Sequence, residues 1–272
     1  MTDDRRDAPE EETGEIRRVR IFMEAIEERA ASRVEPFRWG RGFFDDDHPN
    51  FWDRNFLRVE TDEESLDHRA LIEEAERLHG EAGHRHRSLE FRSETVARRL
   101  APGFASAGWM TEHDLVMVHG GTAEREIDTS TVSEASFEEI AEGMAEFFRR
   151  SSYTDSEETV HQLVDANRVT SRVENTRHFA IFVDGKVASS CDLYSDGHIG
   201  QVEDVNTLEE FRNRGFARAT VSRAVQEAHA AGCDLVFLLA DRDDWPRHLY
   251  TRLGFEDRVV WTSFKRLPTG SR

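Results

Sequence analysis

Residues 203–218 of this 272-residue chain read EDVNTLEEFRNRGFAR, a pattern in which a strand ends and a helix begins after a short turn. The first turn of a helix exposes unpaired backbone N–H groups and the positive end of the helix dipole. Small residues at Gly215 and Ala217 let a phosphate approach that backbone closely. Arg212, Arg214 and Arg218 add positive charge beside it. The segment therefore predicts a turn that binds a pyrophosphate.

Two other phosphate-binding loops do not fit this sequence. The loop of nucleoside triphosphatases ends in Gly-Lys-Ser/Thr, and the chain lacks that signature. The dinucleotide fingerprint places three glycines after the first strand of a βαβ unit. Here the turn has one glycine and follows a run of predicted antiparallel strands. Both kinds of nucleotide site are therefore disfavoured.

The second half of the chain has the element pattern of a mixed α/β protein. Ser136 precedes an apolar helical period and is a plausible helix cap, and Asp184-Gly185 between two β-rich runs indicates a hairpin. Antiparallel strands followed by strand, helix and strand predict a mixed sheet with helices packed on it. We expect helices at 137–150, 156–174, 217–231 and 245–253, and strands at 178–183, 187–193, 198–205, 234–239 and 259–264.

The first half has elements of its own and shares a local pattern with the second. Both contain a strand, a helix, a Gly-aromatic pair (Gly108-Trp109 or Gly254-Phe255) and a further strand. This similarity is either chance or the sign of two similar tandem domains, of which only the second keeps the phosphate turn. Gly120-Gly121 predicts the break between them. We expect a disordered tail at 1–14, domains at 15–121 and 122–272, helices at 15–32, 65–82 and 93–100, and strands at 55–60, 84–92 and 114–119.

The turn also carries a family resemblance. RNRGFA at 212–217 resembles the Gln/Arg-x-x-Gly-x-Gly/Ala turn of the GNAT (GCN5-related N-acetyltransferase) superfamily, and YTRLGF at 250–255 resembles that family's Tyr-x-x-x-Gly-Phe element. The order of elements over residues 123–266 is similar to the family's order as well. The resemblance implies an α/β fold with a mixed sheet, GNAT-like in the C-terminal half. The N-terminal half would be a degenerate GNAT-like or accessory α/β domain.

The resemblance further implies an acetyl-CoA-dependent N-acetyltransferase, in which an amine attacks the thioester directly. Strands 201–205 and 234–240 would splay apart so that pantetheine lies between them. The family often has an Asn after the second of these strands, and here the acidic run 241–244 stands in its place, so the sequence departs from the family pattern at that cofactor contact. The implied cofactor-binding residues are Val205, Arg212, Asn213, Arg214, Gly215, Phe216 and Ala217.

Two residues are candidates for proton transfer in such a reaction. Glu203, at the end of the first strand, would be the base that accepts the amine proton, unless a water chain does so or Glu203 is only a solvated carboxylate. Tyr250 would protonate the departing thiolate, unless it is only a packed aromatic. Strand alternation puts Glu203 and Asp204 on opposite faces, so we expect only one of them to face the cleft.

Composition limits the partners. A formal net charge of −19 disfavours nucleic acid and membrane surfaces, and weakly favours cationic amines. The acceptor is expected to be a small-molecule or protein amine, and a homodimer is possible. The chain has two cysteines, no apolar N-terminal segment, and a longest apolar run of only Leu235–Ala240, so a cytoplasmic protein is expected.

Other residues have less specific expectations. His84 and His86 could bind a metal, but no Cys or third ligand lies at a supporting spacing, so no metal is expected. Cys191 on a predicted strand is expected in the core. The aromatic cluster from Trp39 to Trp52 is expected in the core or along an acceptor pocket between the halves.

Two alternatives to an active N-acetyltransferase stay open at this stage. One is a non-catalytic acyl-CoA sensor or interaction module. The other is a tandem enzyme of thiol-cofactor biosynthesis, since mycothiol synthases also pair two such domains.

Overall fold

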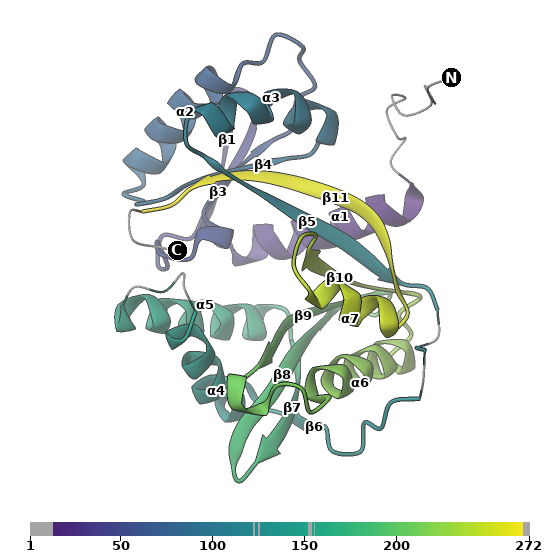
Figure 1. Cartoon of the computed structure of the whole chain (residues 1–272). Helices are drawn as coiled ribbons and strands as arrows, with labels where there is room; N and C mark the ends of the chain where they lie inside the picture. The colour runs from purple at the N-terminus through teal and green to yellow at the C-terminus, as the bar shows by residue number, and fades with distance from the viewer. Residues whose placement is uncertain (1–12, 122, 125, 152–153, 155, 269–272) are drawn as a thin grey trace, which may run out of the picture.

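The computed structural model describes residues 13–121, 123–124, 126–151, 154 and 156–268. The described residues form one mixed sheet with the strand order β1-β2-β3-β4-β11-β5-β10-β9-β8-β7-β6, and helices cover both of its faces (Figure 1). The strands are β1 (Arg33–Phe37), β2 (Gly40–Phe44), β3 (Phe56–Val59), β4 (Arg87–Phe91), β5 (Met110–His119), β6 (Ser133–Ala135), β7 (Arg177–Val183), β8 (Lys186–Ser195), β9 (Ile199–Thr207), β10 (Leu235–Asp241) and β11 (Phe255–Arg266). The helices are α1 (Gly14–Ala30), α2 (His68–Glu81), α3 (Glu94–Ser106), α4 (Phe137–Arg149), α5 (Glu157–Val173), α6 (Phe216–Ala230) and α7 (Pro246–Arg252), with short 3₁₀ helices η1 (Trp52–Arg54) and η2 (Glu209–Phe211).

The two halves repeat the same order of elements. The first runs β1-β2-β3-α2-β4-α3-β5, and the second runs β7-β8-β9-α6-β10-α7-β11. In each half an antiparallel meander is followed by a strand that pairs parallel to the meander's last strand: β4 with β3, and β10 with β9. The predicted strand-helix-strand similarity is therefore confirmed as a similarity of architecture.

The last strand of each half lies between two strands of the other half. β5 lies between β10 and β11, and β11 lies between β4 and β5 (Figure 1). In the N-terminal core the Phe264 ring of β11 stacks on Phe104 of α3, with ring centroids 4.3 Å apart. One sheet thus contains strands from both halves of the chain. The domain boundary between 15–121 and 122–272 stays a prediction.

Helix α1 packs on the part of the sheet that both halves share. Its period places Ile16, Val19, Phe22 and Ile26 on one buried face, against β5, β8 and β10. The Thr13 side chain accepts a hydrogen bond from the N–H of Ile16 and caps the helix. Residues 1–12 of the predicted tail lie outside the described residues, and 13–14 belong to the cap and first turn of α1.

Several elements differ from the sequence expectations, and β5 and β11 each begin four residues earlier than expected. The Gly-rich aromatic stretch forms the β1–β2 hairpin. Gly40 of β2 permits the close pairing with β3, because a Cβ there would lie 1.9 Å from the Arg58 carbonyl oxygen. Helix α3 continues to Ser106 rather than ending at Leu100. The three-residue strand β6 was not expected.

The C-terminal half has a core on each face of its sheet. Helix α6 packs on β8 and β9 over one core, and α4 and α5 cover the other. Ser136 caps α4 in a capping box with Glu139, as its position predicts. Cys191 is fully buried in the first core, as expected. None of the described helices is long and apolar enough to cross a lipid bilayer.

Candidate active site

Strands β9 and β10 separate beyond their first three paired residues. Their parallel pairing ends at Gln201 and Phe237. Past that point, none of the described residues 202–207 pairs with 238–241; β9 stays paired with β8, and β10 with β5. The splay expected between these two strands is therefore present, and it leaves one backbone edge of β9 without a strand partner.

A bulge lies in β9 where the strands diverge. Asp192 of β8 pairs with Glu203, but Ser190 pairs with Asn206, so β9 has one more residue than β8 over this interval. Asp204 adopts a left-handed backbone conformation with φ of 49°. Glu203 and Asp204 both line the same cavity. The expectation from strand alternation, that only one of them faces the cleft, was wrong because the bulge breaks the alternation.

The turn before α6 presents free backbone donors. Gly215 precedes the helix with φ of 84°, which favours glycine, and no side chain caps the helix. Among the described residues, no acceptor lies within hydrogen-bond distance of the N–H groups of Phe216, Ala217 or Arg218. The guanidinium of Arg218 lies 3.1 Å from the position of a Cβ on Gly215. Donors and a cation thus converge on one point, as an anion site requires.

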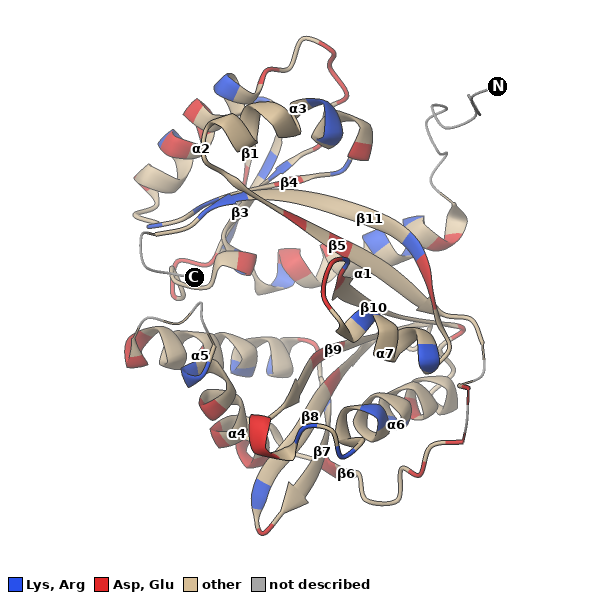
Figure 2. Cartoon of the chain, in the orientation of Figure 1, with Lys and Arg blue, Asp and Glu red and all other residues tan. Residues whose placement is uncertain are grey.

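The other basic residues of the turn are tied to its backbone. Arg212 donates to the Thr207 carbonyl at 3.4 Å, and Arg214 donates to the Glu210 carbonyl at 3.1 Å. Both side chains, and that of Asn213, are exposed. Basic segments mark the loop that leads into α6, in a molecule with many acidic segments (Figure 2). The local positive charge that the sequence predicts therefore lies on the exposed surface of the turn.

The acidic run after β10 organises the start of α7. The Asp241 carboxylate accepts from the N–H of Asp243 at 2.8 Å, and the Asp244 carboxylate accepts from the N–H of Trp245 at 2.7 Å. In this chain, acidic residues that form a turn therefore stand where the family often has an Asn.

Glu203 has the properties of a base. Burial raises its pKa to about 7, and the nearby Asp192 carboxylate adds to that shift. The Gln201 amide donates to a Glu203 oxygen at 2.6 Å and fixes the carboxylate. A carboxylate with this pKa accepts a proton readily near neutral pH.

A hydrogen-bonded chain holds Asp192 behind Glu203. Asp192 lies 2.7 Å from Nδ1 of His178, and Nε2 of the same ring lies 2.7 Å from the Ser171 hydroxyl. Asp192 and His178 are both buried. The chain fixes the position of the Asp192 charge that Glu203 experiences. Sequence reasoning missed it, because Ser171, His178 and Asp192 come from three different elements.

Tyr250 lies on α7, packed edge-on against Phe255 with ring centroids 6.2 Å apart. Burial raises the pKa of its phenol above the ordinary value, and the negative charge of Glu203 adds to this. The phenol therefore stays protonated across the neutral range. Its hydroxyl is therefore available as a hydrogen-bond and proton donor.

A cavity of 670 Å³ reaches from Glu203 and Asp204 to the N-terminal half. Phe43, Phe51 and Trp52 line it from that half, whereas Trp39 and Phe44 are buried in the core. Part of the aromatic cluster therefore lies in the core, and part lines this cavity; that the cavity receives the acceptor stays a prediction. Helix α5 forms the opposite wall of the cavity, through Leu163, Asn167 and Thr170.

Some of the acidic residues that line this cavity form ion pairs, and others do not. Lys265 pairs with Asp53 at 2.8 Å and with Glu112 at 2.6 Å, and Arg58 pairs with Glu27. Glu203 and Asp204 form no ion pair with any described residue. Burial and the neighbouring carboxylates raise the pKa of Asp204 well above its ordinary value, as they do for Glu203, so this end of the cavity holds two carboxyl groups that bind protons more tightly than free carboxylates do.

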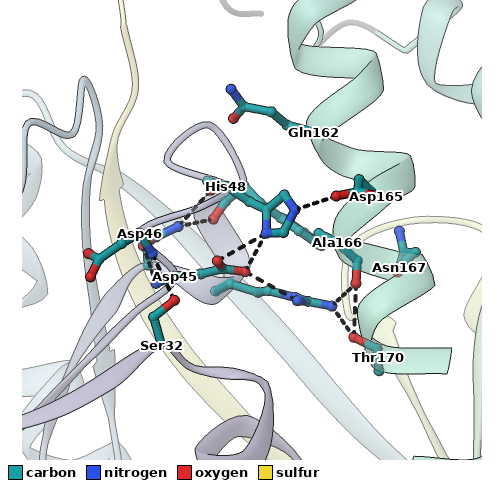
Figure 3. A network of polar contacts seen from close by, with 12 residues as sticks. Ser32, Asp45, Asp46, His48, Gln162, Asp165, Ala166, Asn167 and Thr170 are labelled. Carbon is teal, nitrogen blue, oxygen red and sulfur yellow. Dashed lines mark hydrogen bonds and ion pairs between the residues drawn. The ribbon is translucent and has the colours of Figure 1, made fainter. Parts of the chain in front are cut away.

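The loop that carries Phe51 and Trp52 is fixed to α5 by a polar network (Figure 3). His48 contacts the Asp45 carboxylate at 2.9 Å and the Asp165 carboxylate at 3.3 Å. Arg54 donates to the Ala166 carbonyl at 2.6 Å and also to the Thr170 hydroxyl. This network joins the two halves across the cavity, and no local sequence pattern predicts it.

The N-terminal half holds a second group of titratable side chains. His79 joins His84 and His86, and all three are buried. Burial lowers the pKa of His84 to about 4 and that of His86 to about 3. The spacing in sequence indicates no third candidate ligand for the pair, but the chain turns at Gly83 (φ of 74°) and brings His79, at the end of α2, back to the start of β4.

Comparison with known proteins agrees with this arrangement. The model of the acetyltransferase (GNAT) family matches residues 137–255. A curated acetyltransferase of Pectobacterium atrosepticum is 33% identical over 86 residues, which are 31% of this chain. The matched part spans 61% of the length of that relative.

Two solved structures share the fold over most of the chain. A GCN5-related N-acetyltransferase from Kribbella flavida is 18% identical, with a TM-score of 0.56 over 91% of this chain and 94% of that one. A tandem GNAT protein from the clavulanic acid biosynthesis pathway is 14% identical, with a TM-score of 0.50 over 83% of this chain and 77% of that one. The two solved structures thus share the fold of most of the chain, and the family match assigns residues 137–255, in its C-terminal half, to the acetyltransferase (GNAT) family.

Proposed function

We propose that this chain transfers an acetyl group from acetyl-CoA to an amine by direct attack on the thioester. The observation that carries the proposal is the coincidence of two features: the β9–β10 splay and the uncapped amides of Phe216, Ala217 and Arg218. The splay offers a backbone edge to pantetheine, and the amides offer donors to the pyrophosphate. The same region is matched by the acetyltransferase family.

The acceptor would approach from the cavity that both halves line. Aromatic walls at Phe43, Phe51 and Trp52, and unpaired carboxylates at Glu203 and Asp204, suit a cationic amine with an apolar body. Glu203 lies in the middle of β9, where the strand borders this cavity. It would take the proton that the attacking nitrogen loses, so that the nitrogen lone pair can form the new C–N bond.

The C–S bond then breaks, and the sulfur leaves with the bonding electrons. Tyr250 would give its phenolic proton to that thiolate and later recover one from solvent or from Glu203. Holding the amine and thioester together can lower the barrier by about 7–11 kcal/mol, and each proton transfer adds about 10²–10⁴ in rate. Positioning therefore contributes more than either proton transfer taken alone.

The test is turnover. Purified protein is incubated with acetyl-CoA and a broad panel of amines, and released CoA thiol is measured. We expect thiol release that depends on an amine, with cationic amines that carry an aromatic or aliphatic body among the best. Tight acetyl-CoA binding without turnover of any amine would contradict the proposal and favour an acyl-CoA-binding module instead.

A further inference from the structure

Three imidazoles meet inside the N-terminal half, away from the residues assigned to acyl transfer. His79 lies in the last turn of α2, and His84 and His86 lie in the segment that enters β4. Their ring centroids are 5.2–5.3 Å apart, and at most 5% of any of the three residues is exposed. One ring nitrogen of each lies within 4.8 Å of those of the other two.

The three rings cannot satisfy one another. Nδ1 of His79 lies 3.0 Å from Nδ1 of His84, a contact in which one nitrogen donates and the other accepts. Nε2 of His86 lies 2.9 Å from the Asn55 carbonyl oxygen, which can only accept, so Nε2 carries the proton. Nδ1 of His86 is then an unprotonated acceptor. It is buried and has no hydrogen-bond partner among the described residues.

A buried nitrogen lone pair without a donor costs free energy, and a metal ion removes that cost. Zn²⁺ accepts imidazole nitrogens at about 2.0–2.1 Å, which places two ligand nitrogens about 3.3 Å apart. The His79–His84 separation is already close to that value. The bond from His86 to a backbone carbonyl is also the type of outer contact that orients metal-binding histidines.

We propose that His79, His84 and His86 bind one Zn²⁺ ion through a ring nitrogen each, with a fourth position left for water. The ion would join the end of α2 to the start of β4 and so stabilise the N-terminal half. It would also support one wall of the acceptor cavity, because Trp52 lines that cavity and its ring centroid lies 6.2 Å from that of His86.

The test measures metal on the full chain and does not depend on acyl transfer. Chelator-treated protein is dialysed against ZnCl₂, and bound zinc is measured by mass spectrometry. We expect about one zinc per chain, a higher Tm with zinc than without it, and, with Co²⁺ instead, visible d–d absorption typical of low-coordinate cobalt. The cobalt spectrum needs no variant, so it remains informative if a variant fails to fold.

Variants locate the ion. His86→Ala and His84→Gln should lose the bound zinc and the Tm increase. His161→Ala changes an exposed histidine of α5 and should keep both. His229→Ala removes half of a second imidazole pair, in which Nε2 of His229 lies 3.3 Å from Nδ1 of His119, and it should also keep both. Zinc below about 0.1 per wild-type chain, or zinc lost with His229→Ala but kept with His86→Ala, would overturn the proposal.

Discussion

Glu203 and Asp192 lie directly opposite each other in the β8–β9 ladder, and no cation separates the two carboxylates among the described residues. Nδ1 of His178 contacts the Asp192 carboxylate at 2.7 Å and fixes its position opposite Glu203. Burial raises the pKa of Glu203 to about 7, and the Asp192 carboxylate adds to that shift. The pair therefore sets the protonation state of the residue that we assign as the base.

The first prediction concerns the pH dependence of turnover. Glu203 accepts a proton only when it is ionised, so kcat/KM should fall below about pH 7 with the slope of a single protonation. Glu203→Gln should lower kcat/KM by about 10²-fold or more and remove this limb of the profile. Initial rates from pH 5.5 to 9 measure both effects. An unchanged acidic limb in the variant would assign the limb to another group.

The same raised pKa predicts a stability effect. Folded Glu203 binds its proton more tightly than the unfolded chain does, so its contribution to stability falls as the pH rises from about 4.5 towards 7. Glu203→Gln should therefore be more stable than wild type at pH 8 by about 1–2 kcal/mol, and the difference should shrink at pH 5.

Urea unfolding at the two pH values measures this difference, with Glu158→Gln at an exposed position as the control. A Glu203→Gln protein less stable than wild type at pH 8 would show that burial does not penalise the Glu203 charge.

Tyr250 supplies a third prediction. Tyr250→Phe keeps the ring that packs on Phe255 and removes only the acidic proton. We expect kcat to fall about 10²-fold, while the Kd for acetyl-CoA and the Tm stay close to the wild-type values. Steady-state kinetics, calorimetry and thermal unfolding separate these quantities. A wild-type kcat would leave Tyr250 a packing residue.

Much of this site is predictable from local sequence, and the reasons are physical. Gly215 is visible because a positive φ before a helix favours glycine, and the Asp184-Gly185 hairpin follows the same rule. Tyr250 is visible because it keeps a fixed spacing to Gly254 and Phe255 within one short segment.

The features that sequence analysis missed depend on register and long-range pairing. The bulge at Asp204 follows from how β8 and β9 align, and alternation within β9 alone does not reveal it. His79 joins His84 only because the chain reverses at Gly83. The placement of β11 beside β4 joins residues far apart in sequence, and no local pattern encodes that choice.

The exchanged strands lead to a fourth prediction. Phe264 belongs to the C-terminal half, yet its ring is fully buried against Phe91 and Phe104 of the N-terminal core. Phe264→Ala should destabilise the chain by about 3–5 kcal/mol and raise amide exchange in β4 and α3. Phe182→Ala removes a ring that is 38% exposed and should cost much less. Equal costs for the two variants would contradict the strand placement.

The most direct test of the account is acetyl-CoA binding at the turn before α6. Calorimetry compares wild type with Gly215→Glu, which puts a side chain and a negative charge where the pyrophosphate would lie, and with Gly185→Glu. Gly185 has a similar positive φ, and nothing lies within 4 Å of its Cβ position, so its variant matches the strain and the charge. We predict that Gly215→Glu weakens binding at least 100-fold while Gly185→Glu binds like wild type; equal affinity in all three proteins would contradict the account.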